Sequence, residues 1–378
     1  MNAPTPAEQR AVDAAQRFVD THVRPNALAW DQGRADTRSL FSDAARAGLL
    51  GLEVPVEHGG QALSFGSKCR VAEILAAADF GLAMALINSH NVANHLARMA
   101  APDVVRRYVP ALLAGERTGC TALTEPGAGS DFSAITTAAR RVGDGWQLDG
   151  EKTWIVNATH ADVMVVYAQT EPDGRAGGIA AFVVDGTREG CVRSPRLDSS
   201  AARGIDAGGF LLQGYRALAD ELLHPPGQAF KAALTSINGA RIYVAAMCCG
   251  MVAQCLQVAS NYGSQRRTFG KALHEHQGWR WILADAAIDL EAARLLVDAA
   301  SERIDSDRDA QSTAARAKVF ATRMAGRHIA ALLHAMGAEG LREQHPFLRH
   351  LAAAQVAALV DGSTEMLLER LAKDIRNT

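Results

Sequence analysis

Two changes of hydrophobic pattern divide this chain into three stretches. From residue 6 to about 118 the sequence is rich in Ala and Leu, and apolar residues recur every three or four positions, as in Ile74, Leu75 and Ala78. This period predicts amphipathic helices. The period is lost between about 119 and 225 and returns after Pro225-Pro226. The order predicts a β unit between two helical units.

The middle stretch consists of short apolar runs separated by Gly and Asp, a pattern typical of strands and turns. Four such runs are Trp146–Leu148, Val163–Ala168, Gly178–Val184 and Gly209–Leu212. We therefore expect a small β domain over residues 119–225.

The last stretch carries long segments with helical period, which predict antiparallel helices in a bundle. These segments are Phe230–Tyr262, Trp279–Arg303, Thr313–Met336 and Pro346–Leu371. At 378 residues, the chain is long enough for two or three structural units. The predicted fold class is α+β and multidomain: an N-terminal helical domain (1–118), a small central β domain (119–225) and a C-terminal four-helix bundle (226–378).

Charge and hydropathy exclude several partners. The 39 Lys and Arg residues nearly balance the 41 Asp and Glu residues, and no basic cluster is interleaved with aromatics, so nucleic acid is not expected. Apolar stretches such as Ile242–Met251 are shorter than the roughly 20 residues of a membrane span. The start, Met1–Thr5, lacks a charged and then apolar signal pattern. We expect a cytoplasmic protein without a membrane partner.

The six cysteines show no CxxC spacing. Cys248 and Cys249 lie in an apolar helical context, which indicates buried, small hydrophobic side chains in a reducing compartment. No metal site is expected.

The stretch Ala122–Asp131 combines hydroxyls with a tight Pro and Gly turn. Pro126 fixes φ and removes a donor, while Gly127 and Gly129 admit positive φ. Ser130 then offers its hydroxyl and its N–H to an anion. Such a loop can hold a phosphate and a ring edge, although the same residues are also found in ordinary surface turns.

A second segment, Gly150–Asn157, precedes the apolar run Val163–Ala168. Together with Ala122–Asp131, these segments resemble the flavin-contacting strands of the acyl-CoA dehydrogenase family. The resemblance covers essentially the whole chain and continues in Tyr262–Lys271, Gln277, His334–Gly340 and Asp361–Glu365. It implies a helical, β, helical fold whose β domain and bundle hold FAD between them.

The resemblance also implies the flavin contacts. Thr124 and Ser130 match hydroxyls that bind the ring and the pyrophosphate, and Trp154 matches an indole that stacks on the ring. Val156 stands where relatives often carry Thr, so a side-chain donor is lost and only its backbone N–H can contact the flavin. The remaining expected flavin contacts are Leu123, Gly129, Ile155, Ser363 and Glu365.

Another group matches residues that reach the flavin of a neighbouring subunit in the family. These residues are Arg266, Phe269, Gln277, Met336, Gly337 and Ala338. Their presence implies a homo-oligomer, either a homodimer or a homotetramer.

Dehydrogenation of an acyl thioester at its α and β carbons needs a base, a hydride acceptor and donors to the carbonyl. No side chain accepts a hydride, so a flavin is required. The gapless match puts Asp361 where the family commonly has the catalytic Glu. Asp is shorter by one methylene, roughly 1.5 Å of reach. An alternative is that Asp361 only caps a turn before the last helix.

The family's other position for the base corresponds to Ala240, beside Arg241, which excludes a relocated carboxylate there. The expected substrate contacts are Ser130, Asn238, Arg241 and Gly362.

The match is weakest in Leu351–Ala354, in the loop Ser199–Asp206 and at Val360. Relatives usually have Tyr at the position of Val360. The small residues near Asp361 are similar to those of relatives that act on thioesters of carrier proteins. Three functions therefore stay open: dehydrogenation of an acyl-CoA, the same reaction on an acyl carrier protein, or flavin binding without turnover. An electron-transferring flavoprotein as acceptor is implied by the resemblance alone.

Overall fold

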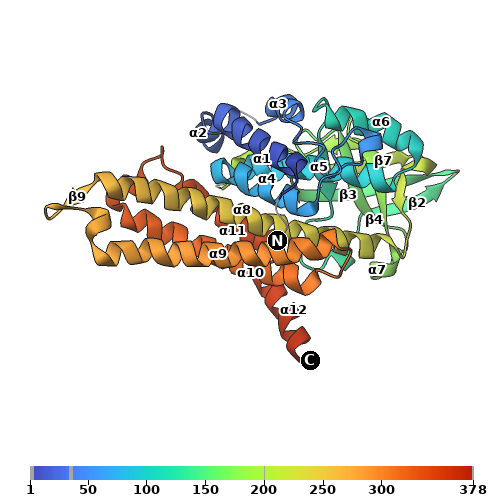
Figure 1. Ribbon diagram of the computed structural model, residues 1–378. Coiled ribbons are helices and arrows are strands. Elements are labelled where there is room, and N and C mark those ends of the chain that lie inside the picture. The colour runs from blue at the N-terminus through green and yellow to red at the C-terminus, as the bar shows by residue number, and fades with distance from the viewer. Residues whose placement is uncertain (1–3, 34–36, 200, 377–378) are drawn as a thin grey trace.

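The computed structural model describes residues 4–33, 37–199 and 201–376, so Ser200 of the loop 199–206 lies outside them. Figure 1 shows helices at both ends of the chain and the sheet at one end of the long C-terminal helices. The N-terminal helices are α1 (Pro6–Phe18), α2 (Ala27–Asp31), α3 (Leu40–Arg46), α4 (Phe65–Ala78), α5 (Phe80–Met99) and α6 (Pro102–Leu113).

Capping side chains fix where these helices begin. Thr5 and Glu8 form a reciprocal capping box at the start of α1. The Asp79 carboxylate accepts a hydrogen bond of 2.7 Å from the N–H of Leu82 and so separates α5 from α4. The direction of α5, which reaches the site described below, is therefore set by a residue at its own N-terminus.

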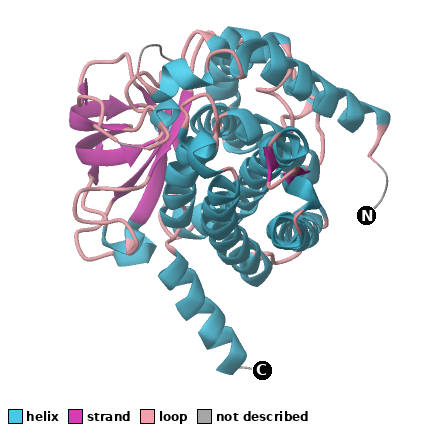
Figure 2. Cartoon of the chain, turned by 90° about the vertical axis from the view of Figure 1, so that its left-hand side faces the viewer, coloured by secondary structure: helices cyan, strands magenta, loops and turns pink. Residues whose placement is uncertain are grey.

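The central β domain is one mixed sheet with the strand order β6-β7-β3-β2-β4-β5-β8, and β1 pairs with β4. In Figure 2 the sheet flanks the helices on one side. The pairs β1 with β4 and β2 with β4 are parallel, and the others are antiparallel. The strands are β1 (Gly119–Ala122), β2 (Ala138–Val142), β3 (Gly145–Ile155), β4 (Val163–Gln169), β5 (Ile179–Asp185), β6 (Cys191–Arg193), β7 (Gly208–Ala217) and β8 (Leu222–His224); the short helix α7 spans Arg175–Gly178.

The strand β4 is buried on both faces, which explains its unbroken apolar sequence. Val163, Val165 and Tyr167 pack with α5 and α6, whereas Met164 and Val166 pack into the second core of the sheet. Alternate residues of a strand point to opposite faces, so β4 joins the sheet to the helical layer.

The C-terminal part is built around α8, as Figure 1 shows. Its elements are α8 (Ala229–Gln265), β9 (Arg267–Thr268), β10 (Lys271–Ala272), α9 (Gln277–Asp305), α10 (Gln311–Ala335), α11 (Phe347–Leu359) and α12 (Thr364–Arg376). The expected fold class is confirmed: helical, β and helical units follow one another. The exact domain limits stay predictions, and β1 begins at Gly119.

The single helix expected over Pro346–Leu371 is wrong, because the chain breaks between α11 and α12. Asp361 and Gly362 have φ of 54° and 98°, in the left-handed region that a continuous helix cannot include. The two helices are bent by 47°. This break forms the turn that carries the proposed catalytic carboxylate.

By length and composition α8 could cross a membrane, and the bent pair α11 and α12 passes the same test. However, 72% of the apolar window of α8 is buried inside the fold. The helix packs against α4, α9 and α10, and its Cys248 and Cys249 are fully buried as expected. The apolar composition of α8 is therefore accounted for by the core that it forms.

Candidate active site

The loop after β1 is held by a buried ion pair. Lys152 on β3 donates hydrogen bonds of 2.9 Å to the main-chain oxygen of Leu123 and 2.8 Å to the Glu125 carboxylate. Glu125 also accepts hydrogen bonds from the main chain of Thr136 and Thr137. Burial alone would raise the pKa of Glu125, but the charge of Lys152 and these donors bring it down to about 2. The loop is thus fixed by charges inside the β domain.

The sequence interpretation did not assign a role to Glu125 or Lys152. Each lies in one of the two motif segments, and opposite charges in two segments that must meet were a usable signal. A charged residue at an otherwise buried position needs a partner nearby, which each of these residues finds in the other.

Trp154 presents an exposed aromatic surface beside this loop. Its side chain is 62% exposed and its φ is 56°. It lies where the register between β3 and β7 shifts, between Lys152 and Ile155. Such an irregularity redirects a side chain out of the sheet. The N–H of Thr153 donates to the oxygen of Thr124 at 3.1 Å, so the indole and the loop are neighbours.

The residues of this region fit a flavin. A Cβ added at Gly127 or Gly129 would meet nothing within 4 Å, so the main chain of the turn faces open space. Ser130 is exposed next to it, and Val156 is half-buried. An open turn with N–H donors suits an anion, and an exposed indole suits a planar ring. The side chain of Ile155 is buried in the sheet, so its expected contact with the flavin would use the main chain.

The second group of expected flavin residues lies at the far end of the bundle. Phe269 is 97% exposed, and Arg266 and Gln277 are exposed with it. The indole N–H of Trp279 donates to the oxygen of Ala335 at 2.9 Å. This contact brings the turn after α10 to the same end, where Met336 is buried and Gly337 and Ala338 are exposed.

Figure 1 shows the hairpin β9-β10 at the opposite end of α8 from the sheet. The 37 residues of α8 span about 55 Å. One chain therefore does not bring the two groups together.

Two cations hold the turn that carries Asp361. Lys318 on α10 donates to the main-chain oxygens of Val360 and Gly362, the latter at 2.6 Å. Arg241 on α8 donates through Nε to the main-chain oxygen of Asp361 at 2.9 Å. All three bonds use carbonyl groups, so they fix the backbone and leave the carboxylate of Asp361 free.

Among the described residues, the carboxylate of Asp361 has no hydrogen bond or ion pair. Burial raises its pKa, and the charges of Lys318 and Arg241 oppose that shift. The alternative role of Asp361 as a helix cap is wrong, because the Ser363 hydroxyl accepts the hydrogen bond of Met366 N–H at the start of α12. A free carboxylate with a raised pKa is suited to act as a base.

The other residues expected near the base have fixed positions. Asn238 accepts a hydrogen bond of 2.8 Å from Arg241. A Cβ on Gly362 would meet an Arg241 nitrogen at 3.3 Å, so the turn and this arginine are in close contact. Ala240 is buried, and Glu365 is exposed on α12. The sequence missed Lys318, because one Lys inside a helical pattern gives no sign of what it contacts.

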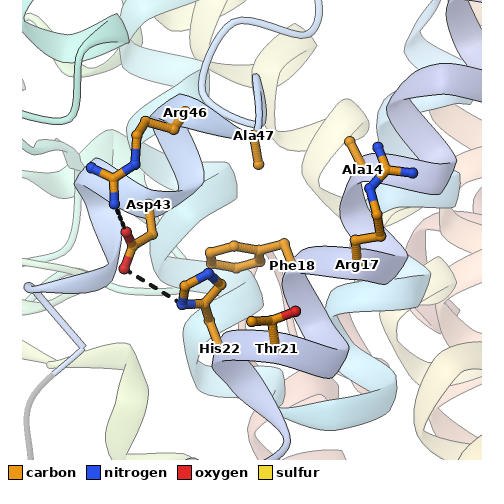
Figure 3. Close-up of a pocket in the computed structure, with 8 residues that line it drawn as sticks. All are labelled: Ala14, Arg17, Phe18, Thr21, His22, Asp43, Arg46 and Ala47. Atoms are coloured by element: carbon orange, nitrogen blue, oxygen red, sulfur yellow. Dashed lines mark hydrogen bonds and ion pairs between the residues drawn. The ribbon is translucent and has the colours of Figure 1, made fainter.

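A separate hollow of about 370 Å³ lies between α1 and α3 (Figure 3). Phe18 forms part of it, and Asp43 contacts both His22 and Arg46 there. None of the residues that line it belongs to the flavin loop or the Asp361 turn. Among the described residues, no group of three or more His, Cys, Asp or Glu could hold a metal ion.

A helical, β, helical chain with a loop that fits a flavin and a free, partly buried carboxylate has the features of a flavin-dependent oxidoreductase. Family models for the N-terminal, middle and C-terminal domains of acyl-CoA dehydrogenase match residues 5–116, 120–214 and 227–375. The chain belongs to the acyl-CoA dehydrogenase family and is an FAD-dependent oxidoreductase that acts on CH–CH bonds.

Individual relatives agree over nearly the whole length. The chain is 30% identical to the human mitochondrial short-chain specific acyl-CoA dehydrogenase, covering 95% of this chain and 87% of the relative. It is 30% identical to benzylmalonyl-CoA dehydrogenase of Aromatoleum aromaticum, and the match covers 97% of this chain and 98% of the relative. Its fold matches butyryl-CoA dehydrogenase of Megasphaera elsdenii with a TM-score of 0.95 at 27% identity, covering 99% of both chains.

Proposed function

We propose that this chain oxidises an acyl-CoA to its α,β-enoyl thioester, with Asp361 as the base that takes the α-proton. The observation that carries the proposal is the free carboxylate of Asp361 on a turn held by Lys318 and Arg241. Relatives named for short-chain acyl-CoA, butyryl-CoA and benzylmalonyl-CoA support the substrate class.

Each protein group has a defined part in this reaction. Asp361 takes the α-proton on a carboxylate oxygen, and its raised pKa makes it a stronger base than an exposed Asp. Lys318 and Arg241 keep the carboxylate in place through the main chain. When bound, FAD supplies the acceptor for the hydride that leaves the β-carbon. Thr124, Ser130 and Trp154 would hold it on the β domain, and the open turn at Gly127 and Gly129 leaves room for it.

The experiment is an anaerobic titration of the FAD-loaded protein. Bleaching of the flavin by butyryl-CoA supports the proposal. Bleaching only by a butyryl thioester on a carrier protein would replace CoA with a carrier as the natural partner. If no acyl thioester of CoA or of a carrier protein bleaches the flavin, the chain binds flavin without dehydrogenase turnover, and the proposed function is wrong.

The functional unit in this proposal is a homodimer or homotetramer. Arg266, Phe269 and Gln277 are exposed far from the β domain of their own chain, where they could reach the flavin of a neighbour (Figure 1). The helix α12 projects from the rest of the chain in Figures 1 and 2 and exposes Met366 and Ile375. A projecting helix with exposed apolar side chains gains stability when a second subunit covers them.

An electron acceptor and a cellular location also belong to the proposal. A chain in the structure of the electron transferring flavoprotein of Acidaminococcus fermentans has the same fold, with a TM-score of 0.95 and 27% identity, and this supports an electron-transferring flavoprotein as acceptor. The six cysteines are free thiols, which supports a cytoplasmic location because a reducing compartment preserves thiols.

A further inference from the structure

Two asparagines interrupt the buried surface of α5. Between Phe80 and Ala93 every residue is buried except Asn88 and Asn91, which are half-buried. Residues three apart on a helix lie on the same face, so the two amides share one side of α5. Both amides therefore keep partial exposure on a face that is otherwise covered.

This face of α5 lies between the flavin loop and the proposed base. Asn88 accepts a hydrogen bond of 3.2 Å from the N–H of Thr121, on the strand that leads into the flavin loop. One turn further, Asn91 donates to the hydroxyl of Tyr243 on α8 at 3.4 Å. The Tyr243 hydroxyl is close enough to Asp361 for the charge of that carboxylate to raise its pKa, although burial raises it more. The acyl chain of a substrate placed between flavin and base therefore lies near Asn91.

Buried charges behind Asn91 fix which way its amide points. Lys68 donates to the amide oxygen of Asn91 at 3.2 Å, so the amide nitrogen faces Tyr243. Glu53 contacts Lys68 and accepts from His90, so the charge of Lys68 is compensated. Asn91 thus presents a neutral donor, held by residues that take no part in the proposed chemistry.

Two donors remain without an acceptor among the described residues. They are the second N–H of Asn91 and the O–H of Tyr243, which itself accepts from Asn91. A hydrocarbon acyl chain would cover both donors and leave them unsatisfied, which costs free energy. A substrate with an oxygen at this place would satisfy them.

We propose that the natural acyl group carries a neutral oxygen substituent beyond its β-carbon, which accepts hydrogen bonds from Asn91 and Tyr243. This inference rests on the proposed function and names its substrate class. The reaction is unchanged: the α-proton goes to Asp361, the β-hydride goes to the flavin, and the substituent stays intact. Asn91 and Tyr243 are then the residues that select the acyl group.

The test compares acyl-CoA pairs in which a hydroxyl replaces a methyl group: 4-hydroxybutyryl-CoA against pentanoyl-CoA, and 5-hydroxypentanoyl-CoA against hexanoyl-CoA. The readout is the anaerobic rate of flavin reduction divided by the apparent Kd. In at least one pair, we expect the native protein to prefer the hydroxyl compound by about tenfold or more, because a site built for a hydroxyl rejects the analogue that lacks it.

Asn91→Leu and Tyr243→Phe should each remove most of that preference. Asn94→Leu, the same substitution on the same helix at a side chain that already accepts from Arg98, should keep it. Tyr243→Phe keeps the ring, so it covers the case in which Asn91→Leu fails to fold. An alkyl preference in both pairs would overturn the inference, as would a hydroxyl preference that both variants retain. Failure of every thioester, butyryl-CoA included, would instead refute the proposed function.

Discussion

The ammonium of Lys318 lies 2.6 Å from the main-chain oxygen of Gly362 and also donates to the oxygen of Val360. It therefore contacts the residues on both sides of Asp361. Burial lowers the pKa of Lys318 to about 8, so the lysine remains mostly charged at neutral pH. The position of the base therefore depends on a lysine of another helix, and this lysine precedes Asp361 by 43 positions in the sequence.

Lys318→Met should slow flavin reduction by an acyl-CoA by about tenfold or more. The change removes hydrogen bonds from a charged donor, each contributing about 1.5–3 kcal/mol, and frees the turn to move the base. Stopped-flow measurement under anaerobic conditions gives the rate. Lys318→Arg, which keeps the charge, should retain more of the rate than Lys318→Met. Equal rates in native protein and Lys318→Met would show that the turn holds without this lysine.

Asp361→Asn should bind FAD normally and lose about 10²-fold or more in the rate of flavin reduction. The amide has nearly the shape of the carboxylate but cannot take a proton, and general-base catalysis contributes on this scale. Unchanged reduction kinetics would remove Asp361 from the mechanism.

Asp361→Glu tests the length of the base. A faster rate than the native protein would show that Asp is too short for this site, and a slower rate would show that the site is shaped around Asp. The rates of the variant and the native protein are compared at equal flavin content, which is read from the absorbance of the bound flavin.

Asp361→Asn should also raise the melting temperature at neutral pH. Burial raises the pKa of Asp361, so the folded state binds its proton more tightly than the unfolded state does. Below the unfolded pKa the carboxyl is neutral in both states and the variant gains nothing. Above the folded pKa the native chain holds a buried charge that the amide lacks. The difference in Tm should therefore grow as pH rises from 3 to 7, and a constant difference would contradict the assignment.

Lys152→Met should weaken FAD binding by about tenfold or more, because the Glu125 carboxylate loses its buried partner and the loop loses its link to β3. Equilibrium dialysis measures the affinity. Lys152→Met combined with Glu125→Gln removes both charges and should recover part of the loss. Normal affinity in Lys152→Met would show that the loop does not depend on this pair.

Phe269→Asp should shift the protein toward smaller species in sedimentation experiments and lower its flavin content. A charge on a side chain that is 97% exposed does not disturb the fold of its own chain, so the effect must come from a neighbour. Val142→Asp is the matched control, because Val142 is also an exposed apolar residue but lies on the β domain. A monomeric native protein saturated with FAD would contradict the model of shared sites.

Sequence patterns predicted most of the fold, since long periodic segments mark the helices and apolar runs mark β4 and β5. The helical period did not predict the break at Asp361, which only the alternative of a capped turn before the last helix included. An Asp-Gly pair inside an apolar helical pattern is a weak signal, and main-chain bonds from Lys318 and Arg241 stabilise the turn. Such bonds join positions far apart in the sequence, which periodicity does not report. Periodicity does not report the pair of Glu125 and Lys152 either, and only the opposite charges of the two motif segments indicated it.

The contacts of Lys152 with Leu123 and Glu125 all lie within the β domain of one chain. A single folded subunit therefore shapes this part of the flavin site by itself. In the proposed oligomer, association would add the part that carries Phe269. Two events that complete the same site are thermodynamically linked: flavin favours assembly by the same factor by which assembly tightens flavin. In such an oligomer, the concentration of flavin would control how far the subunits associate.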